Sequence, residues 1–400
     1  MRNSYSEVLA NRQFKRIWLV GLIAAVGDQI FPICATVILL NQGSGASEIA
    51  ILMSARVIAL LTLAPIGGVW ADRLSRKLVI VSGAIIRSTL CFFVFLAGEG
   101  QSLYLLAGLV FLMGASEAFS GPAGGAIIPS VVDRDLLQSA NALKAMSGRF
   151  ASISGPGIAA GLIALIGPRL GFLLTSILFA IAALGLSRII ITEPKTERSR
   201  FFEDLRSGFN FIKSNGWMAA TMVILALQIS ILFGAEMVLL PVITKEEFDS
   251  TRIYPIAIAC LSFGSLLSSY LAGKTVAKNP GRASFLSWFF ISTLLIGLIF
   301  PLNVPFVLIC YFIGGVATQP MGIFWATAIQ KNVPAELRGR VISLDQTLTG
   351  ALVPLGMLMA GPISEAIGAK MYLFVALGSF LFLNCLALSS RAIARFGPSK

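Results

Sequence analysis

The chain has 400 residues, of which 56% are hydrophobic and only 12% are charged, and its mean hydropathy is +0.85. An ordinary soluble domain carries about twice that share of charged residues, so these values exclude a soluble globular protein. The formal net charge of +12 suggests a nucleic-acid-binding protein, but the distribution of the cations along the chain argues against this, as shown below. Histidine is absent, so any proton chemistry must use carboxyl groups.

Apolar segments of about 20 residues follow one another along the whole chain, and each is long enough to cross ~30 Å of hydrocarbon as an α-helix. A transmembrane β-barrel would show shorter segments with strict alternation. The sequence therefore predicts an all-α membrane protein with about 12 transmembrane helices. The expected spans are 14–40, 47–70, 77–98, 102–125, 138–166, 169–191, 217–244, 253–275, 283–302, 305–328, 341–366 and 369–391.

The Lys and Arg residues indicate how the chain lies in the membrane. When the spans are threaded in order, roughly 24 of the 31 cations fall on one side, and such an excess marks the cytoplasmic loops. Both termini are therefore expected in the cytoplasm. The basic composition reports membrane topology, so nucleic acid is not expected as a partner. The first apolar run is also too long for the core of a cleavable signal peptide.

The longest polar stretch, 192–216, divides the chain into two predicted bundles of six spans, 1–191 and 217–400. Apolar residues recur within this linker at helical spacing, which predicts an amphipathic helix at the cytoplasmic surface. These residues are Phe201, Leu205, Phe209 and Ile212.

The two halves resemble each other at a shift of 201 residues, which aligns 131–143 with 332–344. Three later residues fall on identical partners at the same shift. The pairs are Gly155 with Gly356, Gly167 with Gly368, and Phe179 with Phe380. Two six-helix repeats are typical of secondary transporters, in which the substrate binds at the interface between the repeats.

Seven ionisable residues lie inside the expected spans. They are Asp28, Arg56, Arg87, Glu117, Arg149, Glu236 and Asp345. Each unpaired charge near the bilayer centre costs ~2.5–3.5 kcal/mol, so these side chains must pair with one another or face a wet cavity. Five of the seven are in the first half, which favours proton coupling there and a mainly apolar substrate wall in the second half.

We expect Asp28 to gain and lose a proton during transport, and Glu117 to be neutralised by Arg56, Arg87 or Arg149. For Arg87, a structural ion pair with a neighbouring span is an equal alternative. Another alternative is that Glu236 is simply solvated, because it lies nearer the outer end of its span.

The connection between the second and third spans reads GGVWADRLSRKL (67–78). It resembles the loop 2–3 signature of the major facilitator superfamily, G-x-x-x-D-R-x-G-R-K, with one departure, Ser75 in place of a glycine. The matching residues are Gly68, Asp72, Arg73, Arg76 and Lys77. Further similarity to drug exporters, the branch with macrolide-efflux and enterobactin-exporter relatives, lies in Gly27-Asp28, Gly121-Pro122, SANAL (139–143), Gly155-Pro156, FFEDLRSGFNFIKSN and PAELRGRV (334–341).

This resemblance implies a major facilitator fold and proton-coupled export of amphipathic small molecules by alternating access. The substrate, protons and the lipid bilayer are the partners it implies, for a monomer in a bacterial inner (plasma) membrane. Gly155 and Pro156 partly match the antiporter motif of the family, and they give a helix that bends easily. An uptake carrier or a lysophospholipid flippase on the same fold, or a non-transporting membrane receptor, are the alternatives.

The loop motif is expected to act as a latch. Asp72 would lie at the positive N-terminus of the eleventh span, and Asp345 would pair with Arg73 or Arg76 when the cytoplasmic side is shut. No enzymatic activity, cofactor or metal is expected. The stretch AGKT (272–275) resembles the end of a phosphate-binding loop, but it lacks the first glycine and the preceding strand.

Overall fold

The structure is a computed structural model in which the described part of the chain is helical almost throughout. It describes residues 4–73, 75–98, 100–133, 136–189, 201–273 and 278–397. Within these ranges no β-strand occurs. The side chains of 64–73 lie outside the described part, and with them Gly68, Asp72 and Arg73 of the loop motif.

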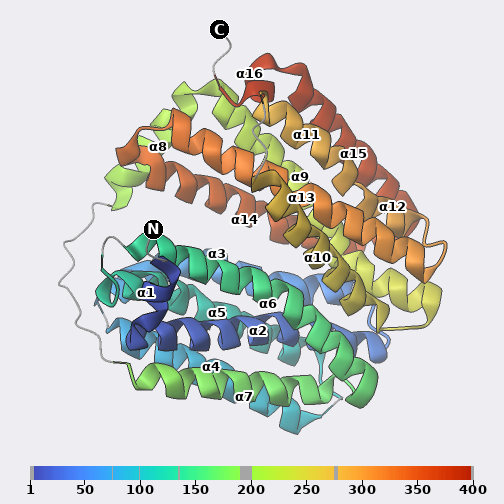
Figure 1. The fold of residues 1–400 in the computed structure, drawn as a ribbon. Helices are drawn as coiled ribbons and strands as arrows, with labels where there is room; N and C mark the ends of the chain where they lie inside the picture. Colours follow the sequence, from blue (N-terminus) through green and yellow to red (C-terminus); the bar gives the residue numbers. More distant parts are fainter. Residues whose placement is uncertain are drawn as a thin grey trace. The chain divides into compact units, whose positions relative to one another are not determined.

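The chain forms two compact units, and the first consists of Met1–Ser44 and Ala55–Glu197. Its elements are α1 (Ser4–Ala10), α2 (Arg12–Asn41), most of α3 (Ala46–Arg73), α4 (Arg76–Ala97), α5 (Leu103–Ile127), the 3₁₀ helix η1 (Ile128–Ser130), α6 (Leu137–Ile166) and α7 (Arg169–Ser187). Within this unit α2 packs against α6 and α7, and α4 packs against α5 and α7 (Figure 1).

The second unit consists of Gly45–Ser54 and Arg198–Lys400. Its elements are α8 (Phe201–Ser214), α9 (Gly216–Phe248), α10 (Ile253–Gly273), α11 (Pro280–Ile291), α12 (Thr293–Ile299), α13 (Val304–Asn332), α14 (Ala335–Ile367), α15 (Ala369–Ser389) and α16 (Arg391–Arg395). The first turns of α3 belong to this unit as well. The amphipathic helix expected in the linker corresponds to α8, which packs on α14 through a hydrogen bond of 2.7 Å from Arg340 to Ser207.

Eleven helices of the described chain are long and apolar enough to cross a membrane, and Ile253–Ser269 is a shorter apolar helix. The prediction of an all-α membrane protein is thereby confirmed. Most expected spans match an observed helix to within about four residues at each end, and two differ more. The ninth is broken into α11 and α12, and the eleventh begins at Ala335 and not near Val341.

Each difference has a local cause. At the break, the hydroxyl groups of Ser292 and Thr293 donate to the carbonyl oxygens of Phe289 and Phe290, and such bonds compete with regular helix geometry. Figure 1 shows α11 and α12 running on from one another beside α15. In the eleventh span the first turns are polar, so hydropathy marks only where the apolar part of the helix starts.

The predicted repeat is visible in matching contacts inside each unit. Gly155 of α6 approaches Gln29 of α2 so closely that a Cβ on the glycine would lie 2.3 Å from the Gln29 Cβ. At the shift of 201, Gly356 of α14 meets Ser230 of α9, where a Cβ would lie 2.2 Å from the Ser230 carbonyl oxygen. The two bundles therefore cross equivalent helices at equivalent small residues.

The ends of these two helices are alike too. Gly167 ends α6 with φ of +85°, and Gly368 ends α14 with φ of +87°. Only glycine adopts such a conformation without strain, which explains why this residue recurs at both positions.

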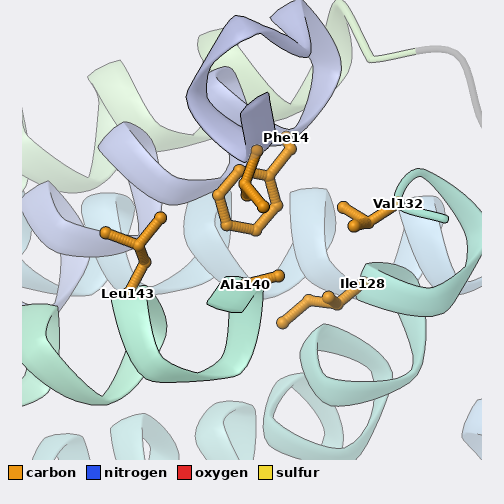
Figure 2. Close-up of a cluster of buried hydrophobic side chains, with 6 residues drawn as sticks. Phe14, Ile128, Val132, Ala140 and Leu143 are labelled. Carbon is orange, nitrogen blue, oxygen red and sulfur yellow. The ribbon is translucent and has the colours of Figure 1, made fainter. Parts of the chain in front are cut away.

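At one end of the first unit, an apolar cluster ties α1 and α2 to η1 and α6. Figure 2 shows the ring of Phe14 against Ala140, with Leu143, Ile128 and Val132 around it. The side chain of Asn11 caps α2 at its start and also donates to the carbonyl oxygen of Val131 over 2.6 Å. These contacts fix the start of α2, the helix that carries Asp28.

Candidate functional site

The first unit holds an ion pair between two spans. Arg87 of α4 donates from Nη1 to both carboxylate oxygens of Asp28 of α2, at 3.1 Å each. The side chains are 8% and 19% exposed, respectively, so both charges are largely withdrawn from solvent. A buried charge is tolerated when it is paired and hydrogen-bonded, and this pair meets both conditions.

Arg87 has two further contacts in addition to its bonds with Asp28. Its guanidinium lies 4.6 Å from the ring centroid of Phe179 on α7, and its Nε donates to the carbonyl oxygen of Gly83 over 3.4 Å. A cation over an aromatic face is attracted by the ring quadrupole. The arginine is therefore fixed by α4 and α7, and Asp28 is the partner that can change its charge.

A second ion pair joins α3 to α5. Arg56 donates from Nε and Nη2 to Oε2 of Glu117, at 3.0 and 2.8 Å. The side chain of Arg56 is 27% exposed and that of Glu117 is 32% exposed, so this pair is more accessible to solvent than the pair of Arg87 and Asp28. Gly114 of α5 lets the helices meet, because a Cβ there would lie 2.5 Å from the carbonyl oxygen of Arg56.

The two pairs interact with each other. Asp28 experiences the charges of Arg56 and Glu117 in addition to that of Arg87. Two acids and two arginines from four consecutive spans thus form one cluster with no net charge. Protonation of one acid would leave the cluster with a positive charge, which the other members would feel.

The helix with the expected bend lies directly beside this cluster. Gly155 and Pro156 are buried in α6, and Gly155 contacts Gln29, the residue after Asp28. Pro156 lies inside a continuous helix, where proline removes one backbone hydrogen bond. Any bending of α6 at this point would act on the segment of α2 that holds Asp28.

The second unit has no such cluster at the equivalent positions. The shift of 201 residues carries Asp28 to Ile229, Arg56 to Ala257, Arg87 to Trp288 and Glu117 to Thr318. Trp288 stacks on Phe380 with ring centroids 5.9 Å apart, in the place where Arg87 lies over Phe179. The aromatic partner is kept and the charge is replaced by an apolar ring.

Glu236 of α9 is the buried acid of the second unit. It is 1% exposed, which removes the alternative that it is solvated near the outer end of its span. It interacts electrostatically with the buried Tyr311 of α13, and among the described residues no Lys or Arg forms an ion pair with it. The burial of a charged carboxylate without a partner is costly.

The other predicted residues lie apart from these groups. Arg149 is exposed on α6, and no ion pair joins it to Glu117 in the described part of the chain. Asp345 is half-buried well inside α14 and accepts a hydrogen bond of 3.0 Å from the indole of Trp325 on α13. Its expected pairing with Arg73 concerns a side chain outside the described residues.

The loop motif is described only at its end. Ser75, the residue that departs from the family signature, is the N-cap of α4 and accepts from the Leu78 amide over 3.4 Å. The departure thus has a local role at a helix start, a position that serine favours. Arg76 and Lys77 follow in the first turn of α4, and both are half-buried.

Sequence reasoning missed two contributors, Phe179 and Gly83. The sequence shows Phe179 only as the identical partner of Phe380 in the repeat. That identity is the available signal, since an aromatic residue at equivalent positions of two repeats indicates a shared packing site. No sequence pattern marked Gly83, whose carbonyl oxygen also accepts a hydrogen bond of 3.0 Å from Ser116 on α5.

Comparison with known proteins agrees with this architecture. A profile of the Major Facilitator Superfamily matches residues 17–357. The multidrug efflux pump Tap of Mycobacterium bovis is 23% identical over 377 residues, covering 88% of this chain and 87% of that protein. The quinolone resistance protein NorA of Staphylococcus aureus is 28% identical over 354 residues, covering 85% of this chain and 87% of that protein.

Solved structures of transporters have the same fold at low identity. The nucleoside transporter NupG superposes with a TM-score of 0.73 at 14% identity, covering 94% of this chain and 98% of that chain. A bacterial homologue of the human lysosomal transporter Spinster gives 0.71 at 15% identity, covering 100% and 99%.

The spans, the repeat and the profile match lead to one assignment. The protein is a multi-pass membrane transporter and not an enzyme, and like the bacterial efflux pumps that it resembles it resides in the plasma membrane. The profile covers more than half of the chain. The chain belongs to the Major Facilitator Superfamily.

Proposed function

We propose that this transporter exports amphipathic or hydrophobic small molecules, such as drugs, macrolides or siderophore-like metabolites, in exchange for protons by alternating access. The observation that carries the proposal is the cluster of two ion pairs in the first unit, which the second unit lacks at equivalent positions. The names of the relatives, a multidrug efflux pump and a quinolone resistance protein, support export of drug-like molecules.

In this proposal Asp28 is the group that carries the exchanged proton. When Asp28 is ionised it neutralises Arg87, and when it is protonated Arg87 keeps only the Gly83 carbonyl oxygen and the Phe179 ring. An uncompensated charge in low dielectric is unfavourable, so each protonation state favours a different arrangement of the helices. Gly155 contacts the residue beside Asp28 and would transmit that change to α6.

The ion pair of Arg56 and Glu117 would alter the electrostatic field at Asp28. Arg56 and Glu117 are more exposed, so they are the members of the cluster that water or a substrate reaches more easily. A substrate that disturbs this pair changes the field at Asp28, which couples substrate binding to proton release. We assign the coupling to these four residues and propose that the chain works as a monomer, since each unit has its own interior.

Glu236 belongs to the proposal as a second proton carrier. It lies in the interior, and no Lys or Arg of the described residues pairs with it, so it would stay neutral until water or a cation reaches it. Proton-coupling groups would then lie in both units, and the second unit would not be a purely apolar substrate wall.

The energy available is sufficient for export. One proton that enters down ~100 mV supplies about 2.3 kcal/mol, and one pH unit adds about 1.4 kcal/mol. Together these sustain a concentration ratio of roughly 500-fold per proton for a neutral substrate, because a factor of ten requires about 1.4 kcal/mol.

The test uses inside-out membrane vesicles that are energised by respiration. A fluorescent lipophilic cation is added to the medium outside the vesicles. The wild-type protein should accumulate the dye until the proton gradient is collapsed. Asp28→Asn should be inserted at the same level and lose gradient-driven accumulation, because asparagine keeps the size of the side chain and removes its proton.

The matched control is Glu247→Gln, which neutralises an exposed carboxylate of α9 and should leave accumulation unchanged. Gradient-driven accumulation by Asp28→Asn at the wild-type rate would refute the role of Asp28. Accumulation that persists after the gradient is collapsed would refute proton coupling altogether.

A further inference from the structure

The start of α3 is fastened to the end of α14, and both partners lie in the second unit. The Ser47 amide donates to Oε1 of Glu365 over 2.8 Å, and the Ser47 hydroxyl donates to Oε2 of the same carboxylate. The first amide groups of a helix have no partner within the helix, and an anion is favoured there. Glu365 therefore caps α3 from a position 318 residues away in the chain.

Close packing accompanies these bonds. A Cβ on Gly361 of α14 would lie 2.7 Å from the Cα of Ser47, and a Cβ on Gly45 would lie 2.8 Å from Oε1 of Glu365. The Gly45 amide donates to Glu48 over 2.9 Å, which shapes the turn ahead of α3. The carboxylate can reach the helix end because both glycines lack a side chain.

The fastening occurs in only one of the two repeats. At the shift of 201 residues, Gly361 and Glu365 of α14 correspond to Ala160 and Ala164 of α6. Alanine offers no acceptor to a helix N-terminus, so α6 cannot form the equivalent contact. The feature is therefore not a requirement of the helix plan that the repeats share.

Helix α3 is divided between the two units, and the contact with Glu365 lies at its start. Residues Gly45–Ser54 group with the second unit, and the rest of α3 groups with the first. By the distribution of cations, the loop before α3 and the loop after α14 face away from the cytoplasm.

We infer that Ser47 and Glu365 form an outer clasp, which holds the start of α3 on α14 and must release when the transporter opens to the outside. The inference rests on alternating access and on the predicted topology, but not on proton coupling. Hydrogen bonds from exposed groups are broken easily, as a contact that opens in every cycle requires.

The experiment measures access to the start of α3 in intact cells. The five native cysteines are replaced by serine, and Ala46, which is 5% exposed, becomes the sole cysteine through Ala46→Cys. A membrane-impermeant maleimide is added from outside. Glu365→Gln should raise the rate of modification about tenfold, because glutamine keeps only one of the two acceptor oxygens and carries no charge.

A second substitution at the same contact and a control substitution elsewhere complete the test. Gly361→Ala places a methyl group against Ser47 and should raise the rate as well, whereas Glu247→Gln changes an exposed carboxylate of α9 and should not. Equal rates in the parent, Glu365→Gln and Gly361→Ala would overturn the clasp. Modification only from the cytoplasmic side would overturn its outer position. Because the assay needs no gradient, its outcome is independent of Asp28.

Discussion

In the first unit Arg87 lies over Phe179 and holds Asp28, whereas in the second unit Trp288 stacks on Phe380 at the equivalent place. A phenylalanine ring is retained at the equivalent position of α7 and α15, and so is the close approach of a glycine to the neighbouring helix, at Gly155 and Gly356. Only the group that fills the space differs. In one unit that group is a charge with a partner, and in the other it is a large apolar ring.

This difference separates what the fold needs from what transport needs. The second unit shows that the helix plan is stable with Ile229, Ala257, Trp288 and Thr318 at these four positions. Ion pairs buried in protein are often no more stabilising than well-packed apolar residues. We therefore expect that the charges of the first unit are not required for folding, and we propose that they serve the transport cycle.

Removing one partner of the buried ion pair should have a stronger effect than any other substitution proposed below. Arg87→Ala should lower the free energy of unfolding by about 3–5 kcal/mol, because it strands the Asp28 carboxylate and also opens space beside Phe179. The measurement is thermal unfolding of the purified protein in detergent. Asp28→Asn combined with Arg87→Met should lose much less than Arg87→Ala alone. A double variant as unstable as the single one would contradict the view that the charges are dispensable for folding.

The next effect tests whether the glycines of the two repeats are truly equivalent. Gly155→Ala and Gly356→Ala should each cost roughly 1–3 kcal/mol, since a Cβ at either site would lie closer to the neighbouring helix than any real contact. Gly157 lies on the same helix as Gly155 with nothing within 4 Å, so Gly157→Ala should be neutral or stabilising by up to about 1 kcal/mol. Chemical denaturation of all three variants compares them directly, and a harmless change at Gly356 would break the equivalence.

The smallest effect concerns the more exposed ion pair. Glu117→Gln should change stability by about 1 kcal/mol or less, because its pair with Arg56 is partly exposed to solvent. Its effect on transport should be larger than its effect on stability, and Arg56→Gln in the same chain should relieve part of the transport loss. Transport rates of the two single variants and the double variant, at equal expression, measure this. A double variant no better than the worse single would remove Arg56 as the functional partner.

Much of this architecture could be predicted from the amino-acid sequence because hydrophobicity over ~20 residues is a strong signal of a membrane span. The shift of 201 residues similarly predicted the matching glycines at the ends of α6 and α14. The spans are apolar all around, however, so their pattern does not tell which face of a helix points inwards.

The pairing of the charges could not be predicted for that reason. Three arginines were equal candidates for Glu117, and only the packing of α3 on α5 selects Arg56 and leaves Arg149 exposed. The burial of Glu236 depends likewise on how α9 turns towards α13, which places Tyr311 beside it. The contact between Ser47 and Glu365 joins the start of α3 to the end of α14, and the 318 residues between them hide it from any local pattern.

We propose that a proton leaves Asp28 when a substrate binds, and proton release by the purified protein tests this directly. The protein is placed in weakly buffered detergent with a pH indicator, a transported lipophilic cation is added, and binding of the cation is measured in parallel by calorimetry. The wild-type protein and Glu247→Gln should release protons on binding. Asp28→Asn should bind the cation with little or no release, whereas release equal to that of the wild type would contradict the account.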